Sequence, residues 1–160
     1  MDVNNYLIEH RGLDWSTILS DWAWLLPESF TVWLMNRFGD LFIVLDDGTV
    51  QRLDVGGGTL EKVAGSRDDF CTKIDEGNNA NDWLMIPLVD RLVAAGITLG
   101  DGQCYSYRKP PIVGGDYTVE NTAVLDIKEH FGFLGSIYEQ MHDVPDGDYV
   151  EFVVVNKPKV

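Results

Sequence analysis

The sequence predicts an α+β fold: a twisted, mainly antiparallel sheet with helices packed on one side. The chain has 160 residues, a length that favours one domain. Two β-rich runs, residues 41–45 and 49–53, flank a tight turn at residues 46–48 that ends in Asp-Gly, which is typical of a β-hairpin. Segments with apolar residues at helical spacing lie before and after these runs, an order that favours an α+β fold.

The N-terminal part is predicted to be helical. Residues 15–26 carry apolar side chains at helical spacing, Asp14 can cap the first turn, and Pro27 ends the helix. Residues 30–35 are apolar and fit either a short helix or a strand.

The hairpin is predicted to extend into a three-stranded meander. Glycines at positions 56–58 make a second turn, and residues 59–63 form the third strand. Both alternating sets of side chains in residues 41–45 are apolar, with Phe42 and Val44 on one face and the leucines and Ile43 on the other. This pattern predicts a central strand that is covered on both sides.

Helices and a second β-rich region follow. Ser66 can cap a helix that runs to about residue 74, and residues 80–95 form another, in which Pro87 predicts a kink or a split. The expected later elements are strands at 103–107 and 122–127, an extended segment with a turn at 110–115, a helix at 133–142, a turn at 145–147 and a terminal strand at 149–155.

The prediction is a single compact domain over residues 1–160. The break near residues 96–102 could separate two subdomains, 1–98 and 99–160, but neither half is clearly independent.

The charge balance narrows the classes of partner. Twenty-six acidic residues against twelve basic ones give a formal net charge of −14. Such a field repels phosphate backbones and anionic membrane surfaces, so neither a nucleic acid nor a membrane is expected as the partner. It attracts basic proteins and speeds their encounter. The alternative is that the acidity serves only solubility.

The protein is expected to be cytoplasmic. The first residues lack the long apolar run of a signal peptide, and no stretch approaches the length needed to span a bilayer. Cys71 and Cys104 are then reduced thiols and are predicted to be small core residues.

The sequence offers no constellation for catalysis, so the protein is predicted not to be an enzyme and to hold no metal or cofactor. The nearest approach to a metal site is Asp126, Glu129 and His130, which solvated charges at the end of an element explain better. No nucleophile–base motif is present, and the glycine runs lack the lysine of a phosphate loop.

A resemblance to a known family emerges from the order of several short motifs. The C-terminal motifs are Gln103-Cys104-Tyr105-Ser106-Tyr107, Lys109-Pro110-Pro111, Gly114-Gly115-Asp116-Tyr117, Glu120-Asn121, an amphipathic helix and Pro145-Asp146-Gly147. With these motifs in this order, the chain resembles, from about residue 30 to residue 155, the immunity proteins that neutralise DNase effectors of the bacterial type VI secretion system. Upstream, residues 36–40, 47–48 and 53–54 resemble the GAD-like domain that precedes the C-terminal immunity part in that family.

One position departs from the family pattern. Gly135-Ser136 stands where Gly-Gln is expected early in the last helix, and a changed surface there would suit a different partner. The motif residues look structural, so the resemblance transfers no catalytic residue.

The resemblance implies an immunity protein that binds and neutralises a secreted antibacterial toxin, with a basic nuclease as the expected partner. The alternatives are a non-catalytic interaction or regulatory module with a housekeeping partner, and a small-molecule enzyme. Loops carry variable binding chemistry on a rigid scaffold. The expected partner-binding residues are therefore Asp46 and Asp47 in the hairpin loop, and Asp116, Tyr117 and Glu120 in the turn after Gly114-Gly115. The competing interpretation is that these are solvated turn residues, with Tyr117 in the core.

Overall fold

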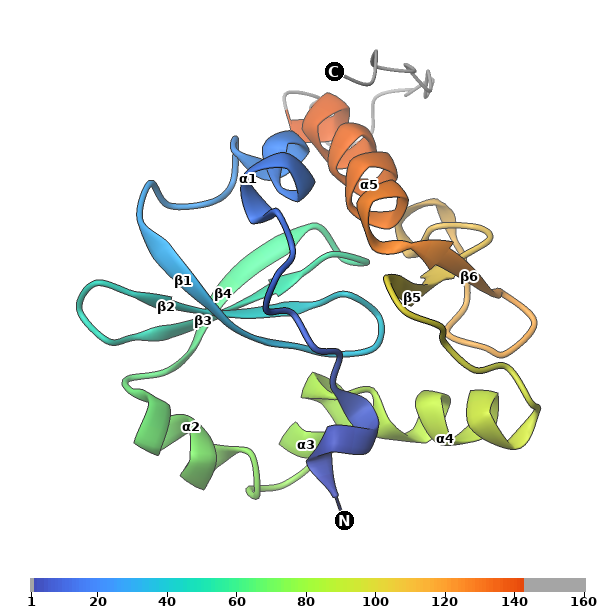
Figure 1. Ribbon diagram of the computed structural model, residues 1–160, viewed down its shortest axis with the longest axis horizontal. Helices are drawn as coiled ribbons and strands as arrows, with labels where there is room; N and C mark the ends of the chain where they lie inside the picture. The colour runs from blue at the N-terminus through green and yellow to red at the C-terminus, as the bar shows by residue number, and fades with distance from the viewer. Residues whose placement is uncertain (1, 143–160) are drawn as a thin grey trace.

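A central four-stranded sheet and a separate hairpin form the β structure of the protein. The computed structural model describes residues 2–142. The antiparallel sheet has the order β1-β2-β3-β4, and the β5-β6 hairpin stands beside it (Figure 1). The strands are β1 Phe30–Met35, β2 Leu41–Leu45, β3 Val50–Asp54, β4 Thr59–Ala64, β5 Gln103–Tyr107 and β6 Thr122–Asp126.

Helices cover both faces of the central sheet. They are α1 Trp15–Ile18, α2 Arg67–Lys73, α3 Asn79–Trp83, α4 Ile86–Ala94 and α5 Ile127–His142, with 3-10 turns η1 Val3–Tyr6, η2 Ser20–Trp22 and η3 Pro111–Val113. In Figure 1, α1 and α5 lie above the sheet, whereas α2, α3 and α4 lie below it.

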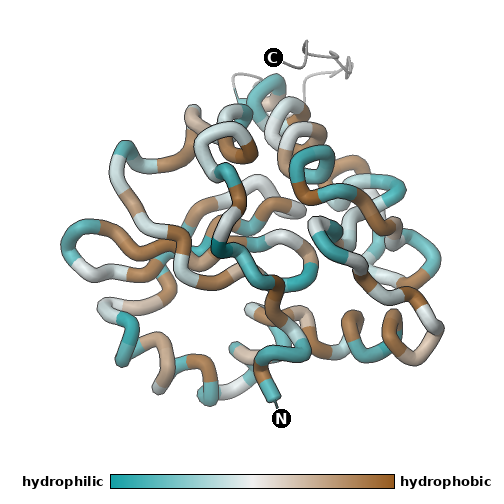
Figure 2. Tube along the Cα trace, viewed as in Figure 1, coloured by the Kyte–Doolittle hydropathy of each residue, from teal (hydrophilic) through white to brown (hydrophobic). Residues whose placement is uncertain are grey.

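The apolar side chains on both faces of β2 explain why helices pack on both sides of the sheet. Leu41 and Ile43 belong to the cluster that includes residues of α1, η2 and α5, whereas Phe42 and Val44 belong to the cluster that includes Phe70. The hydropathy-coloured trace shows β2 as a largely brown, apolar segment in the middle of the molecule (Figure 2). The predicted α+β class and the doubly covered strand are confirmed. The expectation of helices on one side is wrong, because an apolar second face requires its own cover.

The N-terminal helix is shorter than predicted. Helical structure over residues 15–26 is limited to α1, capped by Asp14 as expected, and to the turn η2. The buried Trp22 donates its indole N–H to the carbonyl of Phe131 in α5, 2.9 Å away. This bond draws the chain onto α5 instead of along a continuous helix.

Other elements follow the sequence predictions closely. Residues 30–35, left open between helix and strand, form β1. Ser66 caps α2, and the predicted split near Pro87 separates α3 from α4 at Met85, which has a φ of 51°. The helix α5 begins at Ile127, six residues before the predicted start, and the predicted extended segment at 110–115 contains the turn η3.

The cysteines differ from each other. Cys104 is buried in the core as expected, but Cys71 is exposed on α2, because Phe70 is the residue that faces the sheet there. The predicted turn at residues 145–147 and strand at 149–155 lie outside the described residues.

Candidate partner-binding surface

The hairpin tip carries the first two predicted contact residues. Asp46 and Asp47 are exposed between β2 and β3. Asp47 accepts hydrogen bonds from the amide of Thr49 at 3.0 Å and from its hydroxyl at 2.7 Å, and these bonds lower the pKa of Asp47. Asp46 accepts a bond of 3.1 Å from the hydroxyl of Ser29. Both side chains therefore help to form the turn while remaining accessible.

The β5–β6 loop carries the other three. Asp116, Tyr117 and Glu120 are all exposed, Tyr117 at 49%. Asn121 holds the loop closed, because its side-chain amide donates to the carbonyls of Lys109 at 2.9 Å and Asp116 at 2.8 Å. The loop is thus a fixed platform that presents one aromatic ring and two carboxylates.

The two groups of predicted residues lie at opposite ends of the β2–β3 hairpin. The tip precedes Val50, whereas Tyr117 lies near Asp54, at the other end of β3. Five residues of extended strand span about 17 Å. In Figure 1 the hairpin tip is on the left and the β5–β6 hairpin on the right. The structure therefore does not bring the five residues into one patch.

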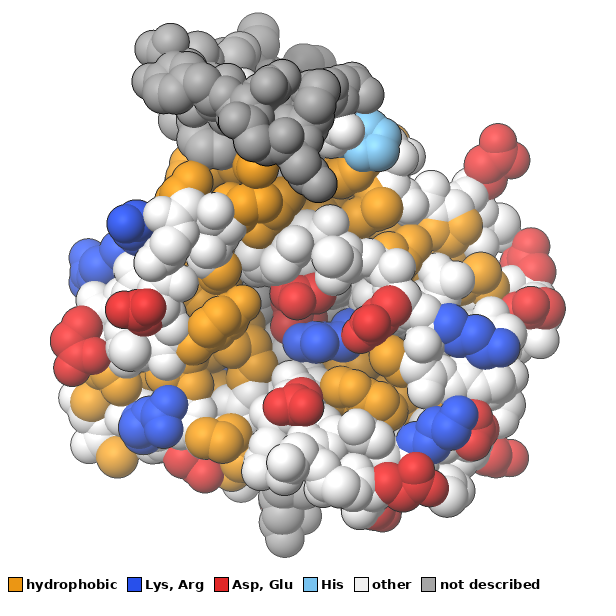
Figure 3. All heavy atoms as spheres, turned by 180° about the vertical axis from the view of Figure 1, so that it is seen from behind, with side chains coloured by type: hydrophobic (Ala, Val, Ile, Leu, Met, Phe, Trp, Pro, Cys, Tyr) orange, Lys and Arg blue, Asp and Glu red, His pale blue; other side chains and the backbone are white. Residues whose placement is uncertain are grey.

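A cleft lies beside Tyr117, between β3, the α3–α4 region and the β5–β6 loop. Its volume is about 420 Å³, and its lining includes Arg52, Asp54, Asp82, Met85, Tyr107 and Tyr117. We call it the Asp54 cleft. The view from behind shows charged side chains of both signs gathered around a hollow near the centre of that face (Figure 3).

Beneath the cleft lies a buried ion pair. A terminal guanidinium nitrogen of Arg52 is 3.0 Å from Oδ2 of Asp40, and their side chains are 13% and 2% exposed. Asp40 also accepts bonds from the amide of Val55 and from Nδ2 of Asn36, both at 3.0 Å. The Arg52 nitrogen lies 3.4 Å from the carbonyl of Asp82. Asp40 therefore has its charge and its lone pairs satisfied within the protein.

The carboxylate of Asp54 has fewer interactions than that of Asp40. Its carboxylate accepts a bond of 2.9 Å from the amide of Gly57, and within residues 2–142 it forms no ion pair. Burial, followed by the nearby Asp40 charge, raises the pKa of Asp54 to about 6. A carboxylate with a raised pKa in a cleft is a candidate functional group.

The glycine turn at positions 56–58 allows the tyrosines to approach. A Cβ on Gly56 would lie 2.7 Å from the ring of Tyr107, and one on Gly58 would collide with the ring of Tyr138. The hydroxyl of Tyr138 donates to the carbonyl of Gly56. These glycines therefore position the end of β3, where Asp54 lies, against the C-terminal part of the chain.

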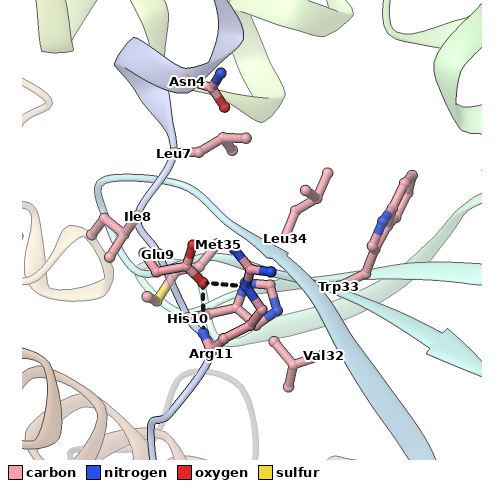
Figure 4. A pocket seen from close by; sticks show the side chains of 10 residues that line it. All are labelled: Asn4, Leu7, Ile8, Glu9, His10, Arg11, Val32, Trp33, Leu34 and Met35. Atoms are coloured by element: carbon pink, nitrogen blue, oxygen red, sulfur yellow. Dashed lines mark hydrogen bonds and ion pairs between the residues drawn. The ribbon is translucent and has the colours of Figure 1, made fainter.

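A second groove borders β1. It has a volume of about 570 Å³ and lies between residues 4–11 and the edge of β1 (Figure 4). Glu9 and Arg11 pair there at 2.9 Å, as the dashed lines show. Because these two charges neutralise each other and are mostly solvent-exposed, they give the groove little electrostatic selectivity.

Residues 2–142 contain no group of three or more His, Cys, Asp or Glu side chains that could hold a metal ion. His130 is fully buried and Nδ1 lies 2.7 Å from the hydroxyl of Ser106, whereas Asp126 and Glu129 are exposed. Burial lowers the pKa of His130 to about 4. No helix in the described part of the chain has the length and apolar character to span a bilayer.

The contact residues expected from the sequence include Tyr117, which lines the Asp54 cleft, but not Asp54, which lines it too. The available signal was a polar pair, Arg52 and Asp54, at alternate positions of a strand whose neighbour β2 is apolar throughout. Alternate strand residues share one face. Nothing in the local sequence indicates that Tyr107 and Tyr117 would reach the same place.

Comparison with known proteins finds a structure of similar fold. No curated protein matches the chain. The crystal structure of Atu4351 from Agrobacterium tumefaciens is similar in fold over 75% of this chain, with a TM-score of 0.51 and 16% sequence identity. The similar region covers 61% of that protein's chain, so the match spans about three fifths of its length.

A family model matches the middle of the chain and most of the C-terminal motifs. Residues 64–138 match the family model described as "T6SS immunity protein Tdi1, C-terminal". The matched segment runs from the end of β4 into α5 and contains the β5–β6 loop with Asp116, Tyr117 and Glu120. This segment of the chain is therefore similar to the C-terminal domain of the type VI secretion immunity protein Tdi1.

Proposed function

We propose that this protein binds a cognate toxin of a type VI secretion system and neutralises it by stoichiometric contact. The family match over residues 64–138 carries the proposal. Such a role needs a stable scaffold and a complementary surface, and it needs no catalytic group. The proposed site of action is the cytoplasm, where an incoming toxin would meet it.

The finer proposal is that the toxin is a basic nuclease. Proteins that hold nucleic acid neutralise phosphates with Lys and Arg. A partner with a formal charge of −14 is complementary to such a groove and would associate rapidly with it. We also propose that the GAD-like part lies before residue 64, where the match to the C-terminal part begins, and that the chain acts as one unit, since one apolar cluster combines Trp22 and Leu41 with Phe131 and Leu134.

The proposed contact surface includes the β5–β6 loop. Tyr117 offers a half-exposed aromatic ring of the kind enriched among interface residues that dominate binding, with Asp116 and Glu120 beside it. Asp46 and Asp47, about 17 Å away along the hairpin, contribute to long-range attraction and contact a toxin that extends to that end of the sheet.

The test is co-expression with the toxin encoded beside the gene for this protein. Protection of the host cells and a one-to-one complex on size-exclusion chromatography are expected. Continued killing, with only a housekeeping protein captured in a pull-down, would instead support the interaction-module alternative.

Salt dependence tests the electrostatic part of the proposal. The Debye length falls from about 30 Å at 0.01 M salt to about 3 Å at 1 M, so association should slow markedly across that range. The triple variant Asp46→Lys, Asp47→Lys and Asp116→Lys should slow it further at low salt. A flat rate, with dissociation unchanged in the variant, would mean that the acidity serves solubility and that the toxin binds elsewhere.

A further inference from the structure

The charges at the Asp54 cleft leave a net negative charge. Arg52 forms its ion pair with Asp40 and attracts Asp54 without contacting it, and Asp82 and Arg91 in the lining carry opposite charges. Asp54 accepts hydrogen bonds from backbone amides and, within residues 2–142, forms no ion pair. The cleft therefore offers a carboxylate without an ion-pair partner, which a cation from outside can reach.

The wall beside Asp54 is aromatic. The rings of Tyr107 and Tyr117 meet edge to face at a centroid distance of 5.5 Å. Tyr107 is only 5% exposed, yet its hydroxyl has one hydrogen-bond contact, with the sulfur of Met85 at 4.0 Å. A thioether is a weak acceptor, so this hydroxyl is poorly satisfied in the free protein. The Asp54 charge also raises the pKa of the Tyr117 hydroxyl, after the larger effect of burial, which agrees with its closeness to the carboxylate.

From this arrangement we propose that the Asp54 cleft receives an arginine side chain of the toxin, whose guanidinium pairs with Asp54 and stacks against Tyr117. This inference rests on the proposed function, because the toxin supplies the arginine. A guanidinium can bond a carboxylate through two parallel N–H groups and can also pack on an aromatic face, which suits this wall better than an ammonium does. The volume of about 420 Å³ accommodates one such side chain with water around it.

The raised pKa of Asp54 agrees with this proposal. Burial raises the pKa of Asp54 to about 6, so the free protein holds this carboxylate ionised at neutral pH only at a cost. An arriving cation removes that cost. Groups that destabilise the free protein while serving a bound partner are found at functional sites.

A small-molecule titration tests the cleft without the toxin. The probe is N-acetyl-arginine amide, and the neutral control is the corresponding citrulline amide, which has nearly the same shape. Amide NMR spectra at pH 7.5 and 0.15 M salt should show saturable shifts at Gly57 with the arginine compound, and affinity at least tenfold weaker in Asp54→Asn. Asp47→Asn is the matched control for general attraction to an acidic protein and should bind as the wild type does.

Two outcomes of the titration would overturn the proposal. One is equal binding of the citrulline compound, and the other is binding that Asp54→Asn leaves unchanged. The amide oxygen of the substituted side chain can still accept the bond from Gly57, so the variant is expected to fold, and a wild-type pattern of amide shifts away from the cleft verifies this.

The toxin provides the second measurement. Its affinity should fall at least tenfold for Asp54→Asn and for Tyr117→Ala, and less than threefold for Asp75→Asn, a control at an exposed aspartate outside the proposed contact surface. If the toxin binds wild type and both cleft variants equally, the inference is wrong while the proposed function stands. If the toxin does not bind the wild type at all, the proposed function fails, and the toxin is excluded as the occupant of the cleft.

Discussion

Replacing Asp54 with asparagine should stabilise the protein at neutral pH. A rise of the carboxyl pKa from 3.8 to about 6 on folding corresponds to about 3 kcal/mol. Because the folded-state pKa is raised, the folded protein binds more protons than the unfolded chain between pH 4 and 6, and the free energy of unfolding falls as the pH rises through that window. Asparagine cannot ionise, so the variant should gain up to about 3 kcal/mol at pH 7.5 and little below pH 4.

The dependence of the unfolding free energy on pH should also show the contribution of His130. Burial lowers the pKa of this imidazole to about 4, so its contribution to stability is complete above pH 6.5 and is lost as the pH falls towards 4. This slope is opposite in sign to that of Asp54, and the two nearly cancel between pH 4 and 6.5. Wild type should therefore be almost flat there, whereas Asp54→Asn should lose about 3 kcal/mol as the pH falls.

Urea unfolding followed by tryptophan fluorescence measures both effects, since Trp22 and Trp83 are buried. For a slope of about 2 kcal/mol per molar urea, the midpoint of Asp54→Asn should rise by about 1.5 M at pH 7.5. Asp47→Asn, at an exposed turn, should show no such gain. An unchanged midpoint for Asp54→Asn, or a wild-type profile that slopes as steeply as that of the variant, would refute the assignment of the raised pKa to Asp54.

Two further substitutions test the structure around the cleft. Arg52→Met leaves the Asp40 carboxylate buried without its cation and should lower the unfolding free energy by about 3–5 kcal/mol in the same urea assay. A loss below about 1 kcal/mol would show that water enters and solvates Asp40. Gly58→Ala combines a φ of 70° with a collision against Tyr138 and should cost about 2–4 kcal/mol. The matched control Gly77→Ala, with a φ of 52° and open space around its Cβ, should cost only about 1 kcal/mol, and equal losses would show that the collision is relieved.

Local patterns in the sequence predicted most of the strands correctly. The β2–β3 hairpin and the cap at Ser66 depend on residues within a few positions of each other, and such features are legible in one sequence. Because both faces of β2 are apolar, the strand needs helices on both sides of the sheet, so the expectation of helices on one side conflicts with this pattern.

The predictions failed where distant residues decide the structure. The bond from Trp22 to Phe131 crosses 109 positions, and no local pattern shows that it would interrupt the first helix. The Asp54 cleft has the same origin, because Tyr107 and Tyr117 reach β3 only through the packing of the β5–β6 hairpin. The sequence predicts only a turn at the glycines 56–58, whereas the close approach of Tyr107 to Gly56 and of Tyr138 to Gly58 requires these two residues to be small.

The family motifs divide into residues that support the frame and residues left available for contact. The side-chain amide of Asn121 donates hydrogen bonds to two carbonyls of the loop. The carboxylate of Asp40 forms an ion pair with Arg52 and accepts a hydrogen bond from the amide of Val55. Tyr117 is half-exposed and meets Tyr107 edge to face, whereas Asp54 accepts a bond from the amide of Gly57 but forms no ion pair within the described residues, and burial raises its pKa. A scaffold selected for stability alone would favour asparagine at position 54. The carboxylate there is best explained by an interaction that the free protein does not make, and a cation on the partner is the group that its charge would bind.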